Sequence, residues 1–157
     1  MIDLIRQRDR FAKLLGMEIV SAGDGKAVTR LVVRDEHLNA MDRVHGGVIF
    51  SLADLAFALA CNSRGVPAVG LSVTINYTKA GKMGNTLTAE AKEITLGSKV
   101  ANYIVEIRDE TDEILALFQG LAYRKQKWCT DRFSSNVDTS PPSPSAAGLR
   151  TGWTPRP

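Results

Sequence analysis

The sequence is poor in the residues that mark metal sites, disulfide frameworks and membrane spans. Only two cysteines, Cys61 and Cys129, and two histidines, His37 and His45, occur among its 157 residues, so neither a disulfide-stapled domain nor a zinc site is expected. No apolar run approaches the roughly 18–20 residues that cross a bilayer, and the N-terminus lacks a signal-peptide core. These absences predict a cytoplasmic protein with no membrane partner, no metal and no other cofactor.

An excess of one charge is also lacking over most of the chain. The net charge is +3, but residues 1–124 hold 15 Lys and Arg against 15 Asp and Glu, and the excess falls after them. Because nucleic acids and anionic membranes select basic surfaces, neither is expected as a partner.

The composition changes near residue 125. Five of the six prolines and both tryptophans follow it, within or around the Ser/Pro-rich stretch SSNVDTSPPSPSAAG. Such a segment buries too little apolar surface to offset the entropy lost on ordering. We therefore predict one folded domain over residues 1–125 and a disordered tail over residues 126–157.

Apolar periodicity predicts two helices. Mixed helical spacing over residues 3–15 indicates a short amphipathic helix. Residues 44–65 form a longer segment that is apolar on nearly every helical face, which predicts a buried helix.

Alternation and turn residues predict about six antiparallel strands. The turn GDGK joins two of them as a hairpin, and Val69, Leu71, Val73, Ile75 and Tyr77 are expected on one face of a third. The predicted ranges are 17–22, 27–34, 68–77, 86–95, 99–108 and 114–124. Because a helix that is apolar all round must be covered, these elements predict an α+β fold with the sheet curled around the long helix.

Asp54 stands out because it lies in the middle of the apolar helix, beside Phe50 and Leu55. A carboxylate among such neighbours costs free energy unless it is paired or hydrogen-bonded. A structural ion pair and a functional carboxylate are the two interpretations that the residues leave open.

His45, Gly46 and Gly47 begin the same helix. Glycines in a first turn let a ligand approach the backbone, and free N–H groups at a helix N-terminus can hold an oxyanion. A plain tight entry into the helix is the alternative.

Gly46 and Asp54 are eight residues apart, about 12 Å along the axis, so one chain cannot bring both to one carbonyl. Two such helices packed antiparallel across a two-fold axis can, which predicts that a dimer forms the site.

Three runs of residues resemble a known family. These are HLNAMDRVHGGVIFSLADLAFALACNSRG, SVTINYTKAGKMGNTLTAEA and ALFQGLAYR, and they closely resemble the PaaI-type hotdog-fold thioesterases of phenylacetate degradation over about residues 10–124. The resemblance implies a curled antiparallel sheet around one helix, and subunits that pair edge to edge into homodimers and then homotetramers. It also implies hydrolysis of acyl-CoA thioesters, with phenylacetyl or hydroxyphenylacetyl groups favoured.

The resemblance also implies roles for four residues. Asp54 is the nucleophile or the general base acting on water, and the Gly46 amide is the oxyanion donor. Asn39 positions the thioester or the water, and His45 orients the turn. The chain departs from the family at residues 78–81, where TKAG stands in place of a frequent Arg-Pro, and in its tail.

Six further residues are candidates for substrate binding. Gly47 extends the turn of Gly46, whereas Ser72 and Thr74, on the polar face of strand 68–77, are placed to line the acyl pocket or to bond Asp54. Lys79, Lys82 and Arg64 are candidates for the phosphates of coenzyme A. Ordinary solvated surface is the alternative for all of these polar side chains.

The chemistry needs no metal, since a thioester carbonyl is already electrophilic and a carboxylate with an oxyanion donor suffices. Ser51 is a poor nucleophile because GVIFSLAD lacks the GxSxG elbow. Two other classes stay open. A hotdog dehydratase would need an acidic partner for His45, and a non-catalytic acyl-CoA binding module would leave Asp54 unexplained.

Overall fold

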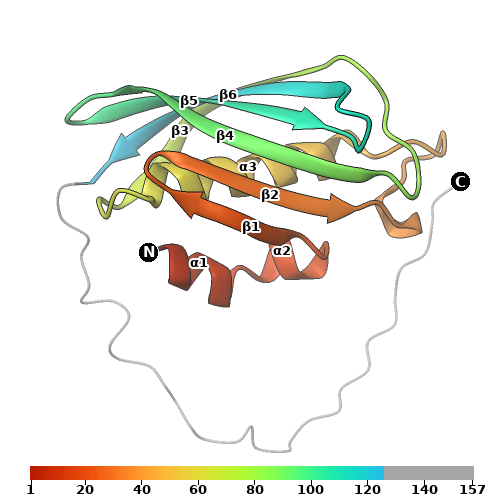
Figure 1. The fold of residues 1–157 in the computed structure, drawn as a ribbon, viewed down its shortest axis with the longest axis horizontal. Helices are drawn as coiled ribbons and strands as arrows, with labels where there is room; N and C mark the ends of the chain where they lie inside the picture. The colour runs from red at the N-terminus through yellow and green to blue at the C-terminus, as the bar shows by residue number, and fades with distance from the viewer. Residues whose placement is uncertain (126–157) are drawn as a thin grey trace, which may run out of the picture.

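The computed structural model describes residues 1–125, and the tail predicted to be disordered, 126–157, lies outside the described residues. The described part is a six-stranded antiparallel sheet with the helix α3 (Gly46–Asn62) lying against one face (Figure 1). The predicted wrap of a curled sheet around one long helix is confirmed.

The strands follow the predicted ranges to within a few residues. They are β1 (Glu18–Gly23), β2 (Lys26–Val32), β3 (Ala68–Tyr77), β4 (Thr86–Leu96), β5 (Val100–Arg108) and β6 (Ile114–Arg124). Their order in the sheet is β1-β2-β4-β5-β6-β3, so β4, β5 and β6 form the predicted meander and β3 is an edge strand beside β6. The edge position of β3 could not be inferred from alternation, because alternation shows which face of a strand is buried but not which strands lie beside it.

The core lies between α3 and the sheet. Phe57 of α3 packs against Phe118 and Tyr103, with ring centroids 5.7 and 5.5 Å apart. The strands pass this ring at Gly70 and Gly120, where an added Cβ would lie 3.2 and 2.8 Å from Phe57. The absence of side chains at these two positions therefore lets the sheet close on the helix.

The β1–β2 hairpin turns through Asp24 and Gly25, whose φ angles are +49° and +76°. Two residues with positive φ match the twist of the flanking strands, which explains why the predicted DG turn works here. The Gly25 amide also donates to the Ser63 hydroxyl at 2.7 Å, which ties the hairpin to the end of α3.

The single helix predicted over residues 3–15 is divided in two. The structure has α1 (Ile2–Arg8) and α2 (Arg10–Leu14), separated by Asp9 in an extended conformation. The Asp9 carboxylate accepts a hydrogen bond from the Ala12 amide at 2.9 Å, so Asp9 begins α2 as its N-cap.

The expected faces of β3 are only partly right. A bulge between Gly70 and Ser72 shifts the register with β6, so that Gly70 pairs with the buried Ala122 and Val73 pairs with Gly120. Gly70, rather than Val69, therefore faces α3 at the start of the strand. Alternation by itself does not reveal a bulge, because the extra residue changes the face without changing the residue types.

The predicted burial of α3 is confirmed for most of its residues, but it does not extend to every face of the helix. Asp54 and Gly47 are exposed and Ser51 and Ala58 are half-buried, which leaves one strip of the helix uncovered by the sheet. The described helices include none that is long and apolar enough to span a bilayer.

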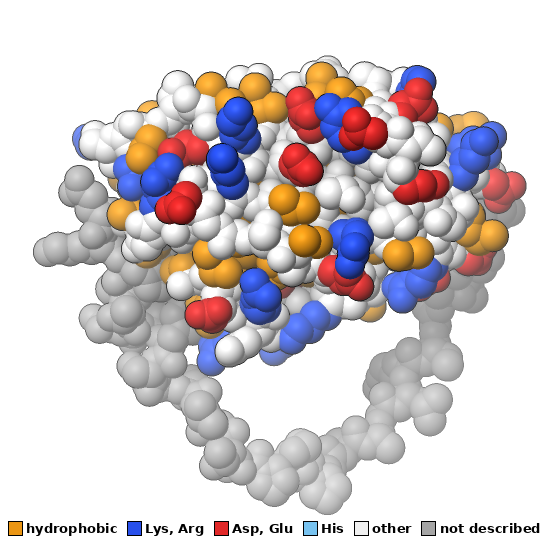
Figure 2. Space-filling view, viewed as in Figure 1, with side chains coloured by type: hydrophobic (Ala, Val, Ile, Leu, Met, Phe, Trp, Pro, Cys, Tyr) orange, Lys and Arg blue, Asp and Glu red, His pale blue; other side chains and the backbone are white. Residues whose placement is uncertain are grey.

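The visible face of the protein mixes both charges. Figure 2 shows acidic and basic side chains interspersed with scattered apolar ones on this face, without a large patch of one sign. This distribution agrees with the balanced charge of residues 1–124.

We expect Gly120→Ala to lower the free energy of unfolding by about 1–3 kcal/mol, because the new methyl group must displace the Phe57 ring. The matched control is Gly23→Ala, where an added Cβ meets nothing within 4 Å. Urea denaturation of both variants at one protein concentration measures the difference. Equal stability of the two variants would contradict the tight closure of the sheet over Phe57.

Candidate active site

The loop before α3 holds Asn39 in a tight turn. An isolated bridge joins Leu38 to Val44, and the Asn39 amide donates to the Arg43 carbonyl at 2.7 Å. The side-chain carbonyl of Asn39 accepts from the amides of Met41 and Arg43, at 2.9 and 3.2 Å. These two bonds fix which end of the Asn39 amide is oxygen, and they leave its NH2 group without an acceptor in residues 1–125.

His45 is the N-cap of α3. Its Nδ1 accepts a hydrogen bond from the Gly47 amide at 2.9 Å, so the neutral ring carries its proton on Nε2. Gly47 permits this approach, since an added Cβ would lie 3.0 Å from Nδ1. Because the Gly47 N–H is occupied, Gly47 cannot serve as an oxyanion donor in this arrangement.

The Gly46 N–H is free within residues 1–125. It is the first amide of α3, and no helical carbonyl precedes it. The Gly46 carbonyl instead accepts a hydrogen bond from the Tyr77 hydroxyl at 3.0 Å, which holds the turn against the end of β3. Partial burial raises the pKa of Tyr77, so this hydroxyl stays protonated and remains a donor.

Asn39 and Gly46 line the same groove. It encloses about 340 Å³ and is also bordered by Tyr77, Lys79 and Ile49. The structure thus brings together, at the start of α3, a free backbone N–H, a free amide NH2 and a lysine. N–H donors of this kind can hold the oxygen of a polarised carbonyl, and the lysine can attract a negatively charged group of the same ligand.

Asp54 lies in a different hollow of about 330 Å³. Phe11, Phe50, Leu55 and Asp9 are among the residues that line it. Within residues 1–125 the Asp54 carboxylate has neither a hydrogen bond nor an ion-pair partner, so a structural ion pair is not what holds it there. Partial burial raises the pKa of Asp54, and the nearby negative charge of Asp9 raises it further.

The protomer keeps Asp54 apart from the groove of Gly46. The two hollows share no lining residue, and the helical rise places Gly46 and Asp54 about 12 Å apart along α3. One protomer therefore keeps the two candidate groups in separate hollows.

Ser72 and Thr74 are not brought to Asp54 by the protomer. They pair with Leu121 and Gln119, which lie on the face of β6 away from α3. No hydrogen bond joins either hydroxyl to Asp54 in residues 1–125. Both residues lie on the edge strand, so only a partner that covers this edge can place them in a site.

The three basic candidates lie in different surroundings. Lys79 borders the groove and pairs with Glu113. Lys82 is exposed, and its ammonium group has no partner among the described residues. Arg64 binds Glu93 at 3.0 Å and the Asp24 carbonyl at 3.2 Å, beyond the C-terminal end of α3. Arg64 therefore stabilises the far end of the helix within the protomer.

Two residues with a positioning role were missed from the sequence. Tyr77 was expected only as an apolar face residue of β3, yet it holds Gly46. His37 is fully buried; its Nδ1 accepts from the Arg34 amide at 3.0 Å, and its carbonyl accepts from the His45 amide at 2.8 Å. His37 thus connects the end of β2 to the start of α3, a contact that no local motif signals.

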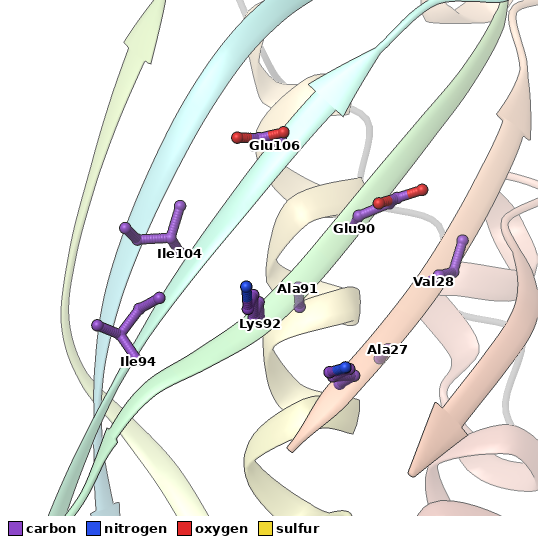
Figure 3. Close-up of a pocket in the computed structure, with 9 residues that line it drawn as sticks. Ala27, Val28, Glu90, Ala91, Lys92, Ile94, Ile104 and Glu106 are labelled. Carbon is purple, nitrogen blue, oxygen red and sulfur yellow. The ribbon is translucent and has the colours of Figure 1, made fainter. Parts of the chain in front are cut away.

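Another hollow, of about 500 Å³, lies elsewhere. Figure 3 shows Glu90, Lys92 and Ile104 of its lining in front of the strands, with α3 behind them, so it opens on the outer face of the sheet. Its walls include the cross-strand pairs Lys26–Lys92 and Glu90–Glu106, together with Ile104. The carboxylate of Asp54 and the amide of Gly46 are not part of it. Residues 1–125 also contain no cluster of three or more potential metal ligands.

The fold and the halves of the site define a class, a hotdog-type domain with a carboxylate on the central helix and a free amide at its start. Comparison with known proteins agrees. Residues 41–116 match the family profile of the thioesterase superfamily. A putative esterase of Archaeoglobus fulgidus is 46% identical over 78% of this chain and 79% of its own length. The acyl-coenzyme A thioesterase PaaI of Escherichia coli is 42% identical over 75% of this chain and 84% of its own length. The chain therefore belongs to the thioesterase superfamily.

Solved structures show the same relationship. The E. coli PaaI protein from the phenylacetic acid degradation operon superimposes with a TM-score of 0.76 and 40% identity, covering 78% of this chain and 89% of that one. A hypothetical thioesterase from Streptococcus pneumoniae, solved with coenzyme A, has a TM-score of 0.72 and 26% identity, covering 77% and 96%. The hotdog fold predicted from the sequence is confirmed.

Burial lowers the pKa of His37, with the positive charge of Arg34 adding to the effect. Above a pH of about 6.5 the ring is neutral in both the folded and the unfolded state. As the pH falls below that value, the unfolded chain takes up the proton first, so His37 costs stability. We expect the stability of the wild type, relative to His37→Asn, to fall between pH 7.5 and pH 5.5. The Asn side chain keeps an acceptor in the position of Nδ1.

Urea denaturation of both proteins at the two pH values, at one protein concentration, measures this relative stability. A constant difference between them would contradict a neutral buried ring.

Proposed function

We propose that the chain is an acyl-CoA thioesterase whose site forms between two subunits. The observation that carries the proposal is the pair of separate half-sites on α3, one with the free Gly46 amide and one with the unpaired Asp54 carboxylate. A two-fold axis that sets two copies of α3 antiparallel brings the Gly46 end of one subunit toward Asp54 of the other. Two equivalent sites result.

The edge strand β3 supports a homodimer. It pairs with β6 on one side, and the groups of its other edge have no strand partner in residues 1–125. Val69, Leu71 and Val73 are all exposed along it. A ten-residue edge that is apolar and lacks charged side chains is a template for pairing with a second strand. Pairing two copies of β3 across the axis also covers Ser72 and Thr74. The further step to a homotetramer stays a prediction from the family resemblance.

The residues then act in sequence. The Gly46 amide and the Asn39 amide group of one subunit hold the thioester oxygen as it becomes negative. The partner's copy of the Asp54 carboxylate attacks the carbonyl carbon or removes a proton from an attacking water. Collapse of the tetrahedral species breaks the carbon–sulfur bond, and the thiolate of coenzyme A leaves. When Asp54 attacks directly, a water then hydrolyses the mixed anhydride on Asp54 and releases the acid. When Asp54 acts on water, the acid forms in this step and Asp54 passes the proton to the thiolate. Lys79 borders the groove and Lys82 is exposed three residues further along the chain, so both are candidates for binding its phosphates.

A small aryl-acyl group is the substrate we infer. The relative from E. coli is named an acyl-coenzyme A thioesterase and comes from a phenylacetic acid degradation operon. The S. pneumoniae structure contains coenzyme A. In this chain the hollow beside Asp54 has two phenylalanines in its walls, which suits a phenylacetyl or hydroxyphenylacetyl group.

Complementation between two inactive variants tests the shared site. Asp54→Asn removes the carboxylate and is expected to lower kcat on phenylacetyl-CoA by about 10²–10⁴-fold. Gly46→Pro removes the N–H and keeps the helical backbone, since proline fits the first helical position and His45 already has the extended ψ of 133° that proline requires. It is expected to lower kcat by about 10²–10³-fold. Random co-assembly of the two variants should restore roughly a quarter of the wild-type activity, because each mixed dimer contains one intact site.

Gly46→Ala is the matched control, because it keeps the N–H and places the same Cβ 3.3 Å from the Tyr77 ring. No recovery on co-assembly would show that one chain carries both groups. Full activity of Asp54→Asn would exclude the mechanism. Tight binding of acyl-CoA without hydrolysis by any of the proteins would favour the binding module.

The pH dependence of kcat/KM gives a further prediction. Asp54 must be ionised to act, so activity is lost as the pH falls through its pKa, which lies above the ordinary carboxyl value because of burial and Asp9. Asp9→Asn removes the like charge but keeps an N-cap acceptor, so the acid limb of kcat/KM should move to lower pH. Asp3→Asn, in α1 and outside the hollow, is the control. An unchanged acid limb in Asp9→Asn would show that Asp54 does not control it.

A further inference from the structure

The hollow beside Asp54 is closed on one side by the N-terminal segment. Phe11 of α2 and Phe50 of α3 both line it, together with Met17 and Leu55. In Figure 1, α2 lies beneath β1, near the middle of α3. Residues distant in sequence thus form an apolar chamber around the Asp54 carboxylate.

Short contacts fix the position of Phe11. Asp9 caps the start of α2, and the Leu15 amide donates to the Phe11 carbonyl at 3.1 Å. The Met17 amide donates to the Ala12 carbonyl at 2.9 Å, and Ala12 is buried against the core. The backbone of α2 is therefore held at both ends, although 58% of Phe11 is exposed.

Charge decides which end of an acyl-CoA enters this chamber. Within residues 1–125, the only charged groups in its wall are the carboxylates of Asp9 and Asp54, which repel the phosphates of coenzyme A. The Ser51 hydroxyl, also in the wall, already donates to the Gly47 carbonyl at 2.7 Å. Of the two ends of an acyl-CoA, the chamber therefore suits the apolar acyl group. The volume of about 330 Å³ is near the lower end of small-molecule sites, which span roughly 300–1,000 Å³, and favours a short or aromatic acyl group over a long chain.

We propose that Phe11 is a specificity-determining residue whose ring forms the outer wall of the acyl pocket and packs against the acyl group of the bound thioester. The proposal rests on the proposed thioesterase function. Its role is to select the acyl group, while Asp54 and the partner's copy of the Gly46 amide perform the reaction. An aromatic acyl group gains ring contacts from Phe11 that an acetyl group cannot reach.

The test compares phenylacetyl-CoA with acetyl-CoA. Phe11→Ala should lower kcat/KM on phenylacetyl-CoA about tenfold, mostly through KM, and change the value on acetyl-CoA by less than about twofold, since the acetyl group makes no contact with the ring. Leu14→Ala is the matched control, because Leu14 lies on the same helix, is 72% exposed and does not line the chamber. Thermal unfolding of each variant checks that α2 is still docked.

A second variant tests the same wall from the opposite direction. Phe11→Trp enlarges the side chain, so it should raise the KM for phenylacetyl-CoA and leave acetyl-CoA hydrolysis unchanged. Equal losses on both substrates in Phe11→Ala, or none on either, would overturn the role of Phe11 while the thioesterase function stands. If the wild type hydrolyses neither substrate nor any other acyl-CoA, both the function and this role fall.

Discussion

An α-helix rises about 1.5 Å per residue, and this rise separates Gly46, with its free amide, from Asp54, with its carboxylate, by about 12 Å along the axis of α3. No rotation of side chains brings these groups to one atom within a protomer. Because the two groups are separated, each has its own supporting contacts. His45, Tyr77 and the 33–45 loop hold the start of α3, and α2 covers the hollow beside Asp54 in the middle of the helix.

The two halves differ in their electrostatics. At the start of α3, backbone and amide N–H groups and the ammonium of Lys79 gather, so negative charge is favoured there. In the middle of α3, Asp54 and Asp9 repel each other within apolar walls, so negative charge is disfavoured. Asp54 is exposed in the protomer, so its unpaired carboxylate stays in contact with solvent until another molecule covers it. In the function we propose, a thioester carbonyl lies between the amide of one subunit and the carboxylate of the other.

Most secondary structure was predictable because each element repeats a simple period. Strand alternation, the DG turn and the apolar length of α3 gave bounds close to those observed. The errors share a cause, which is that a single residue altered the backbone without changing the pattern. Asp9 divides the N-terminal helix because its side chain competes for the Ala12 amide, and the extra residue at the β3 bulge reverses the expected face. Apolar content also does not say which neighbour covers a helix, so it did not reveal the strip of α3 that the sheet leaves uncovered.

The sequence by itself determined the class of fold, because residue type and period fix the elements. It also predicted a role for Asp54 and the HGG turn, and a second subunit, from residue type and helical rise. Only the tertiary structure decided that Gly46 rather than Gly47 has the free amide, since this depends on where the His45 ring lies. It alone showed that Tyr77 and His37 position the turn, that Arg64 is engaged elsewhere, and that α2 closes the hollow beside Asp54. These relations join residues far apart along the chain, and no local pattern encodes such contacts.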